Sequence, residues 1–242
     1  MPFSAVASPA IGLTQLKAVV EKAHPGRFDI AIHYVNHDFH LFLDDPWFYG
    51  HVMSNAGYAT GLGDWLFRQV AFPDAEENAA AYFEAYYPDW SEHGLEVQAA
   101  VRRIRPRLER FLDQVIEDAG LAGADLVGFT TMFSQTTPSI ALARRLKERN
   151  PEVTTVIGGA ACTWPAGEEL ARCLDVIDHV FSGSGLVGFP EYVRLWAARD
   201  VAGCGMIDGV FAGGGRHPLA VTGGWGGRSE EHTSELQSPN TI

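Results

Sequence analysis

Short apolar runs alternate along the chain with stretches whose apolar residues recur every three or four positions. The first run, Phe3 to Ala7, precedes Leu13 to Ala23, which has helical spacing, and His24-Pro25-Gly26 ends that helix. Phe28 to Val35 is again nearly continuous in apolar character, as a strand covered on both faces would be. Strand, helix and strand in this order are typical of a βαβ unit.

The alternation stops between His37 and Gly120. This part is rich in aromatic residues up to about Tyr87 and then carries one long helical pattern from about Leu95 to Ala119. Pro106 lies inside that pattern and should kink or split the helix, and Gly120 follows as its cap. We therefore predict that residues 37–120 form a mostly helical insertion between the second and third strands.

Strands and helices alternate again after Gly120. Further strands are expected at 124–131, 153–160 and 176–182, with helices at 137–149, 166–173 and 189–198, and a short strand pair around Val210. Thr137 is expected to cap the first of these helices, with Pro138 at its first position. The predicted fold class is α/β, a doubly wound, flavodoxin-like (Rossmann-type) five-stranded parallel sheet. In the common order 2-1-3-4-5, the ligand lies over the carboxyl ends of strands 1 and 3.

These elements divide the chain into four parts. Residues 1–36 and 121–200 form the α/β domain, 37–120 the insertion, and 201–227 the start of a linker or β-hairpin. The segment 228–242 is expected to be a non-native or disordered tail, because it has one aliphatic residue over Ser229–Ser238 and no periodicity. It resembles translated sequencing-adapter read-through, which predicts that more protein once followed Gly226 or Gly227; a native disordered tail is the alternative.

Composition and charge exclude several classes of function. The 18 Lys and Arg against 30 Asp and Glu give a net charge of −12, which argues against a nucleic-acid partner. No run of apolar residues is long enough for a membrane span, and the first residues lack the basic region of a secretory signal. Three widely spaced cysteines suit neither a disulfide framework nor a zinc knuckle, so a reducing, cytoplasmic location is expected.

Small and hydroxyl residues follow four of the predicted strands. A glycine lets a bulky ligand approach the backbone, and serine or threonine offers short hydrogen bonds. One such turn alone is ordinary, but four at one edge of a sheet indicate a binding cleft. The candidate site residues are Ser8 and Gly12 after strand 1, Thr130, Thr131, Phe133 and Gln135 after strand 3, Gly158, Gly159 and Ala160 after strand 4, and Gly183, Ser184 and Gly185 after strand 5.

Two of these strand ends resemble cobalamin-binding domains. That family has a hydroxyl-x-apolar triplet after strand 3 and a Gly-Gly pair after strand 4, and Thr131-Met132-Phe133 and Gly158-Gly159 match both. The resemblance implies that these residues line a slot for the nucleotide tail of cobalamin. The classical subgroup also has Asp-x-His-x-x-Gly after strand 1, where this chain keeps only Gly12. Cobalamin without a protein His ligand is therefore expected, and no metal-ligating residue is assigned.

The more specific resemblance is to the N-terminal part of cobalamin-type radical SAM proteins that mature ribosomally made peptides. It covers about residues 1–213, and one departure is Ser184, where the family usually has Glu. It implies an enzyme that modifies, and C-methylates, a precursor peptide with cobalamin and S-adenosylmethionine. The matching stretches are Met1-Pro2-Phe3, Pro9, Gly12-Leu13, Gly63-Asp64-Trp65-Leu66-Phe67, Gly128-Phe129-Thr130-Thr131, Gln135, Ser139 to Lys147, Pro151, Gly158-Gly159-Ala160 and Asp178 to Gly183.

If the resemblance holds, the catalytic half of such an enzyme is expected to lie outside this sequence. Its [4Fe–4S] cluster is usually held by a Cys-x3-Cys-x2-Cys run, which Cys162, Cys173 and Cys204 cannot form. The cluster and S-adenosylmethionine are therefore expected only in a full-length parent. This fragment is expected to have no catalytic residues and no turnover of its own.

Several alternatives stay open at this stage. A free-standing α/β enzyme, such as a hydrolase or transferase, would use the same strand-end cleft, with Cys162 as the nearest titratable group. A scaffold domain that has lost cobalamin binding is a third possibility. A metal at His33, His37 and His40 is less favoured than a solvated loop, and Cys162 is better explained as a small buried residue than as a nucleophile.

Overall fold

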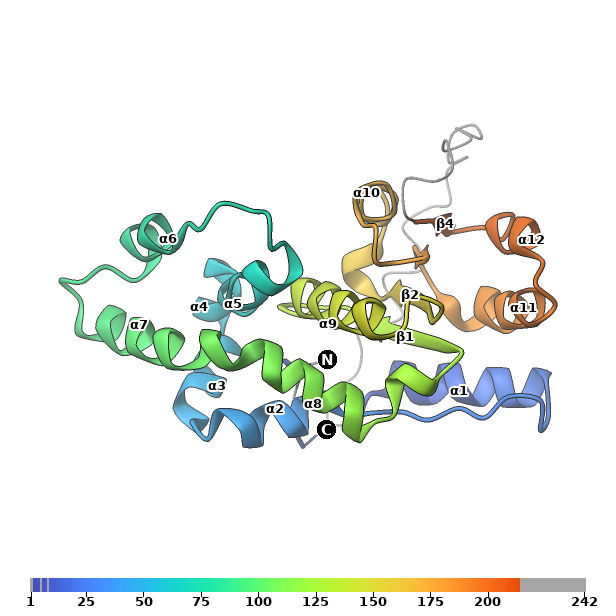
Figure 1. The fold of residues 1–242 in the computed structure, drawn as a ribbon, viewed down its shortest axis with the longest axis horizontal. Helices are drawn as coiled ribbons and strands as arrows, with labels where there is room; N and C mark the ends of the chain where they lie inside the picture. The colour runs from blue at the N-terminus through green and yellow to red at the C-terminus, as the bar shows by residue number, and fades with distance from the viewer. Residues whose placement is uncertain (1, 5, 8, 214–242) are drawn as a thin grey trace, which may run out of the picture.

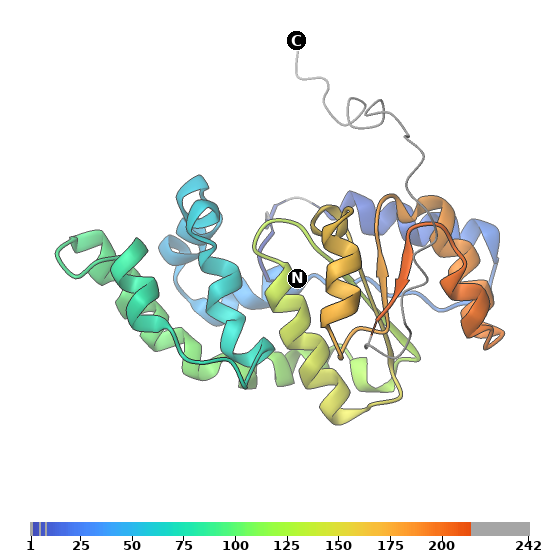
Figure 2. The same ribbon diagram turned by 90° about the horizontal axis from the view of Figure 1, so that it is seen from above.

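The computed structural model describes residues 2–4, 6–7 and 9–213, and its strands form one mixed sheet (Figures 1 and 2). The parallel strands are β1 (Leu126–Thr130), β2 (Thr154–Gly158) and β3 (His179–Phe181). The fourth, β4 (Val210–Ala212), pairs antiparallel with β3, so the order is β1-β2-β3-β4. The first three are the strands that the sequence predicts as the third, fourth and fifth.

The predicted five-stranded parallel sheet is wrong, and the first missing strand is the run from Phe3 to Ala7. The Phe3 side chain is fully buried against Phe39, with ring centroids 5.1 Å apart. The Tyr49 hydroxyl donates a 2.6 Å hydrogen bond to the Ser4 carbonyl. Aromatic packing and a side-chain hydrogen bond thus hold this segment where the sequence pattern predicts a strand.

The second missing strand is the run from Phe28 to Val35. Residues 28–34 alternate between half-buried and exposed, as a strand would, but they do not join the sheet. Lys17 Nζ donates to the Ile30 carbonyl at 2.6 Å, and Val35 already begins the next helix. Within the described part of the chain, the outer edge of β1 therefore has no neighbouring strand.

Helices cover both faces of the sheet. On one face lie α9 (Thr136–Arg149) and α10 (Ala166–Cys173), and on the other lie α1 (Ile11–Ala23), α11 (Gly185–Ala197) and α12 (Val201–Gly205). Alternate strand residues divide between the two apolar clusters, because successive side chains in a strand point to opposite faces. Ile157 and Val180 join the first cluster, whereas Val156 and Phe181 join the second.

The region between the βαβ-like start and β1 consists of helices, which lie beside the sheet at the end opposite α11 and α12 (Figure 1). The long helical pattern divides at Pro106, where a turn of 3-10 helix, Arg105–Arg107, separates the last two helices. The missing N–H of proline explains this division. The helices are α2 (Val35–Leu43), α3 (Pro46–Val52), α4 (Asn55–Thr60), α5 (Leu62–Ala71), α6 (Ala79–Tyr86), α7 (Glu92–Ile104) and α8 (Leu108–Asp118).

Two short 3-10 turns, Leu121–Gly123 and Ala160–Cys162, complete the described elements. No helix in the described ranges is both long and apolar enough to cross a membrane. Residues 214–242 lie outside the described part, so the tail predicted at 228–242 and most of the 201–227 segment stay predictions.

The helical region joins the sheet through a close contact between α5 and α9. A Cβ atom on Gly63 of α5 would lie 2.5 Å from the Cβ of Ser134, just before α9, which is too close for two carbon atoms. Farther along, Arg144 of α9 donates from Nε to the Ala71 carbonyl at 2.8 Å. One apolar cluster runs continuously from this helical region to the sheet.

We expect Gly63→Ala to destabilise the fold, because the added methyl group overlaps Ser134. Overpacking of this kind costs about 1–3 kcal/mol. Gly50→Ala in α3 is the matched control: a Cβ there meets nothing within 4 Å, and alanine is the better helix former by roughly 0.5–1 kcal/mol. Urea unfolding of both variants measures the difference, and equal stabilities would contradict the close contact.

Candidate functional site

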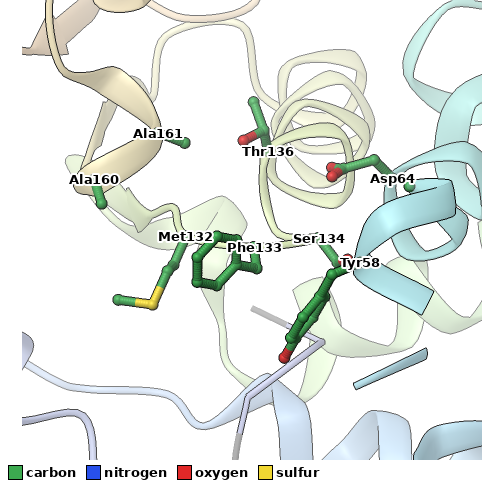
Figure 3. A pocket seen from close by; sticks show the side chains of 9 residues that line it. Tyr58, Asp64, Met132, Phe133, Ser134, Thr136, Ala160 and Ala161 are labelled. Carbon is green, nitrogen blue, oxygen red and sulfur yellow. The ribbon is translucent and has the colours of Figure 1, made fainter. Parts of the chain in front are cut away.

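A cavity of about 320 Å³ opens at the carboxyl ends of β1 and β2, where the strand-end loops meet α4 and α5 (Figure 3). Its position at this edge agrees with the rule for open α/β sheets. The volume is at the lower end of the range for small-molecule sites. Its lining residues are Tyr58, Gly61, Asp64, Met132, Phe133, Ser134, Thr136, Ala160 and Ala161.

Two of the predicted site residues, Phe133 and Ala160, line this cavity. Phe133 is 66% exposed, and its ring centroid lies 5.2 Å from that of Tyr58. Tyr58 comes from α4, so the helical region contributes one wall of the cavity. The Tyr58 hydroxyl donates to Met53 Sδ at 3.6 Å, and burial raises its pKa.

Thr131 and the Gly158-Gly159 pair, which are predicted to line the slot for the nucleotide tail, contact each other directly. The Thr131 amide and hydroxyl both donate to the Gly158 carbonyl, at 2.7 and 3.1 Å. A Cβ on Gly159, whose φ is +118°, would lie 2.3 Å from the Thr131 carbonyl oxygen. Direct contact between two loops of the protein therefore accounts for glycine at this position.

Thr130 and Gln135 serve the fold at the same edge. Thr130 ends β1 in register with Gly158. Gln135 is buried, and its side-chain amide donates a short hydrogen bond to the Phe3 carbonyl. Both residues thus position the loop that carries Phe133 without lining the cavity.

The remaining predicted residues lie outside the cavity lining. A Cβ on Gly12 or on Gly183 would meet nothing within 4 Å, so the backbone at both positions borders open space. A Cβ on Gly185 would lie 3.4 Å from Leu16 Cδ1, which shows that the beginning of α11 packs against α1. Ser184 immediately precedes α11, and Ser8 lies outside the described residues.

Asp64 is the main site residue that the sequence analysis did not assign. Its Oδ1 accepts the Thr137 N–H at 2.8 Å, and the Thr136 N–H and Thr137 hydroxyl also bond to its carboxylate. The expectation that Thr137 caps α9 is therefore wrong, because Asp64 supplies the oxygen. Burial raises the pKa of the Asp64 carboxyl, although these hydrogen bonds oppose the shift. The available signal was a charged residue inside the otherwise apolar Gly63-to-Phe67 motif.

Exposed apolar side chains follow the ends of the parallel strands. Such residues are usually scattered singly, whereas several along one edge indicate a surface that another molecule covers. Met132 and Phe133 follow β1, Trp164 follows β2, and Leu186 and Val187 follow β3, with exposed fractions from 38 to 85%. The cavity is thus part of a longer edge with apolar side chains at several points.

Cys162 lies behind the cavity and has no features of a nucleophile. It is fully buried, burial raises the pKa of its thiol, and its sulfur lies 3.3 Å from the Thr131 hydroxyl. A nucleophilic cysteine needs accessibility and a lowered pKa. The interpretation as a small buried residue therefore agrees with the structure.

Among the described residues that line the cavity there is no histidine, and His179 lies inside β3, where Nδ1 is 2.9 Å from the Tyr192 hydroxyl. His33, His37 and His40 form no metal cluster, because the described residues include no group of three or more potential ligands that could hold an ion.

Comparisons with protein-family models, curated proteins and solved structures found no match to this chain.

We expect one of the three thiols to react rapidly in the native protein. Cys173 is exposed, whereas Cys162 and Cys204 are buried and burial raises the pKa of each thiol. Titration with a chromogenic disulfide at pH 8 should give one fast equivalent, and denaturant should release the other two. The Cys173→Ser protein is the control, and a fast equivalent remaining in it would contradict the burial of Cys162 and Cys204.

Asp64→Asn should change how stability depends on pH. Because burial raises the folded-state pKa above 3.8, the native protein binds this proton more tightly than the unfolded chain does. The Asp64 contribution to stability is thus largest at low pH and falls as pH rises through the folded pKa. Relative to wild type, Asp64→Asn should therefore gain stability between pH 4 and pH 7. Denaturant unfolding at pH 4 and pH 7 measures the stability difference between Asp64→Asn and wild type, with Asp118→Asn at an exposed position as the control. A loss of relative stability from pH 4 to pH 7 would contradict the raised pKa of Asp64.

Proposed function

We propose that this chain is the cobalamin-binding segment of a B12-dependent radical SAM enzyme that modifies, and C-methylates, a ribosomally synthesised precursor peptide. The parent enzyme would also use a [4Fe–4S] cluster and S-adenosylmethionine, which this segment does not hold. The proposed location is the cytoplasm, and nucleic acid and membranes are not proposed partners. The observation that carries the proposal is the cavity at the carboxyl ends of β1 and β2, beside the motifs that resemble the family.

The cavity and its edge suit a large ligand with an apolar ring and polar substituents. Phe133, Met132 and Ala161 supply apolar surface, and Asp64 and Thr136 supply polar groups. A corrin ring is larger than 320 Å³ and would extend over the exposed apolar side chains along the same edge. Open backbone at Gly12 and Gly183 would leave room for this extension.

The direct contact between Thr131 and Gly159 leaves no space between these two residues for the nucleotide tail. The proposal therefore assigns the corrin to the cavity and its edge, and assigns no residue to the tail. Bound cobalamin would carry the transferable methyl group, while the residues of this chain bind and orient it and limit its contact with water.

Two other functions receive less support. A free-standing enzyme would need a titratable group free to act at the cleft, and the raised pKa of Asp64 is a possible sign of one. However, its hydrogen bonds to the start of α9 give Asp64 a structural role that explains its burial. A scaffold without ligand would leave the exposed Phe133 and Val187 without a function.

Hydroxocobalamin should bind the purified protein and change its visible absorbance with saturation at one equivalent. Phe133→Ala should weaken binding about 10-fold or more, because a buried Phe side chain contributes about 1.5–3 kcal/mol. Trp90→Ala removes another exposed aromatic side chain, away from the cavity lining, and should leave binding unchanged. Absence of corrinoid binding by the wild-type protein would refute the proposed function.

The bound cob(II)alamin form should show no protein imidazole on cobalt. Histidine is absent from the described cavity lining, and His179 is committed to the Tyr192 contact inside the sheet. Electron paramagnetic resonance of the protein labelled with ¹⁵N-histidine tests this. A change of superhyperfine splitting relative to the unlabelled protein would identify a histidine ligand and contradict the assignment.

A further inference from the structure

A serine lines the cavity with a hydroxyl group that bonds to none of the described residues. Ser134 is 5% exposed and belongs to the cavity lining. Its hydroxyl makes no hydrogen bond within the described residues, and its oxygen is not one of the fully enclosed side-chain atoms that lack a partner. The hydroxyl is therefore open to the cavity, where it can bond to a ligand or an ordered water molecule.

The backbone holds this hydroxyl in place. Ser134 has a φ of +57°, in the left-handed region that residues other than glycine rarely adopt. Gly63 allows the Ser134 Cβ to approach α5, and the next residue, Gln135, is buried. Strained backbone of this kind persists where surrounding structure fixes it, and it occurs often at binding sites.

The nearest charged group in the lining is the Asp64 carboxylate, which points toward the start of α9 (Figure 3). A carboxylate has about four lone-pair sites, and three groups of α9 bond to this one. The backbone N–H groups of Thr136 and Thr137 are therefore occupied by a protein oxygen. The described lining residues include no Lys or Arg to pair with an anionic group, whereas the Asp64 carboxylate can accept from a hydrogen-bond donor.

Together, an unpartnered hydroxyl and a carboxylate match a primary carboxamide. Its NH₂ group would donate to Asp64, and its carbonyl would accept from the Ser134 hydroxyl. We propose that Ser134 and Asp64 form a subsite for a primary carboxamide of the ligand and discriminate against a carboxylate in the same position. This inference rests on the proposed function, because the corrin periphery carries primary carboxamides.

The experiment compares three corrinoids by visible absorbance titration. The probes are hydroxocobalamin, cobinamide, which keeps the amide side chains but lacks the nucleotide tail, and cobalamin monocarboxylates with one peripheral amide hydrolysed to an acid. The variants are Ser134→Ala and Asp64→Asn, with Asp118→Asn as a charge-matched control on an exposed surface of α8. Asn keeps an oxygen for the α9 N–H groups, and circular dichroism checks that each variant folds.

Ser134→Ala should weaken hydroxocobalamin and cobinamide about 5- to 10-fold, as expected for one lost hydrogen bond. The wild-type protein should bind at least one monocarboxylate isomer 10-fold or more weakly than hydroxocobalamin. In Asp64→Asn, the ratio of these two dissociation constants should be smaller. Binding by wild type that neither variant alters would overturn the subsite while leaving the proposed function intact. Absence of binding of every corrinoid by wild type would overturn both.

Discussion

The packing of α5 against the start of α9 is the contact on which the rest of this structure depends. Asp64 supplies the oxygen that the first N–H groups of α9 need. Because Gly63 has no side chain, Ser134 in the loop before α9 can pack directly against α5. The first turn of a helix leaves such N–H groups unpaired unless a side chain or solvent accepts them. The same contact fixes the direction of α9, and with it the loop after β1 that forms the cavity.

The contact also explains why the helical region belongs to the site. If α4 and α5 were an appendage, the cavity would be lined only by the strand-end loops. Instead Tyr58 and Asp64 come from these helices and face Phe133 of the loop after β1 and Thr136 at the start of α9 (Figure 3). Fold and site are therefore not separable here, because a change that loosens α5 would move a wall of the cavity.

Much of the regular structure was predictable from local patterns. The helix at 166–173 was predicted with its observed bounds, and the division at Pro106 follows from the chemistry of proline. The first two strands were wrongly predicted, because an apolar run carries no information on what covers it. Phe3 is buried among aromatic rings of the helical region, which are distant in sequence. Asp64 was missed for a similar reason, since its partners at 136 and 137 become neighbours only through tertiary packing.

The outer edge of β1 has a consequence for handling the protein. The strand Leu126–Thr130 contains no charged residue and no proline, and its central Gly128 is exposed. Natural sheets protect such edges with lysine, proline, bulges or a covering segment, because a row of unpaired N–H and C=O groups is a template for strands of other molecules. This edge has none of those sequence features, and so it is the place where intermolecular β-pairing, and with it aggregation at high concentration, would begin.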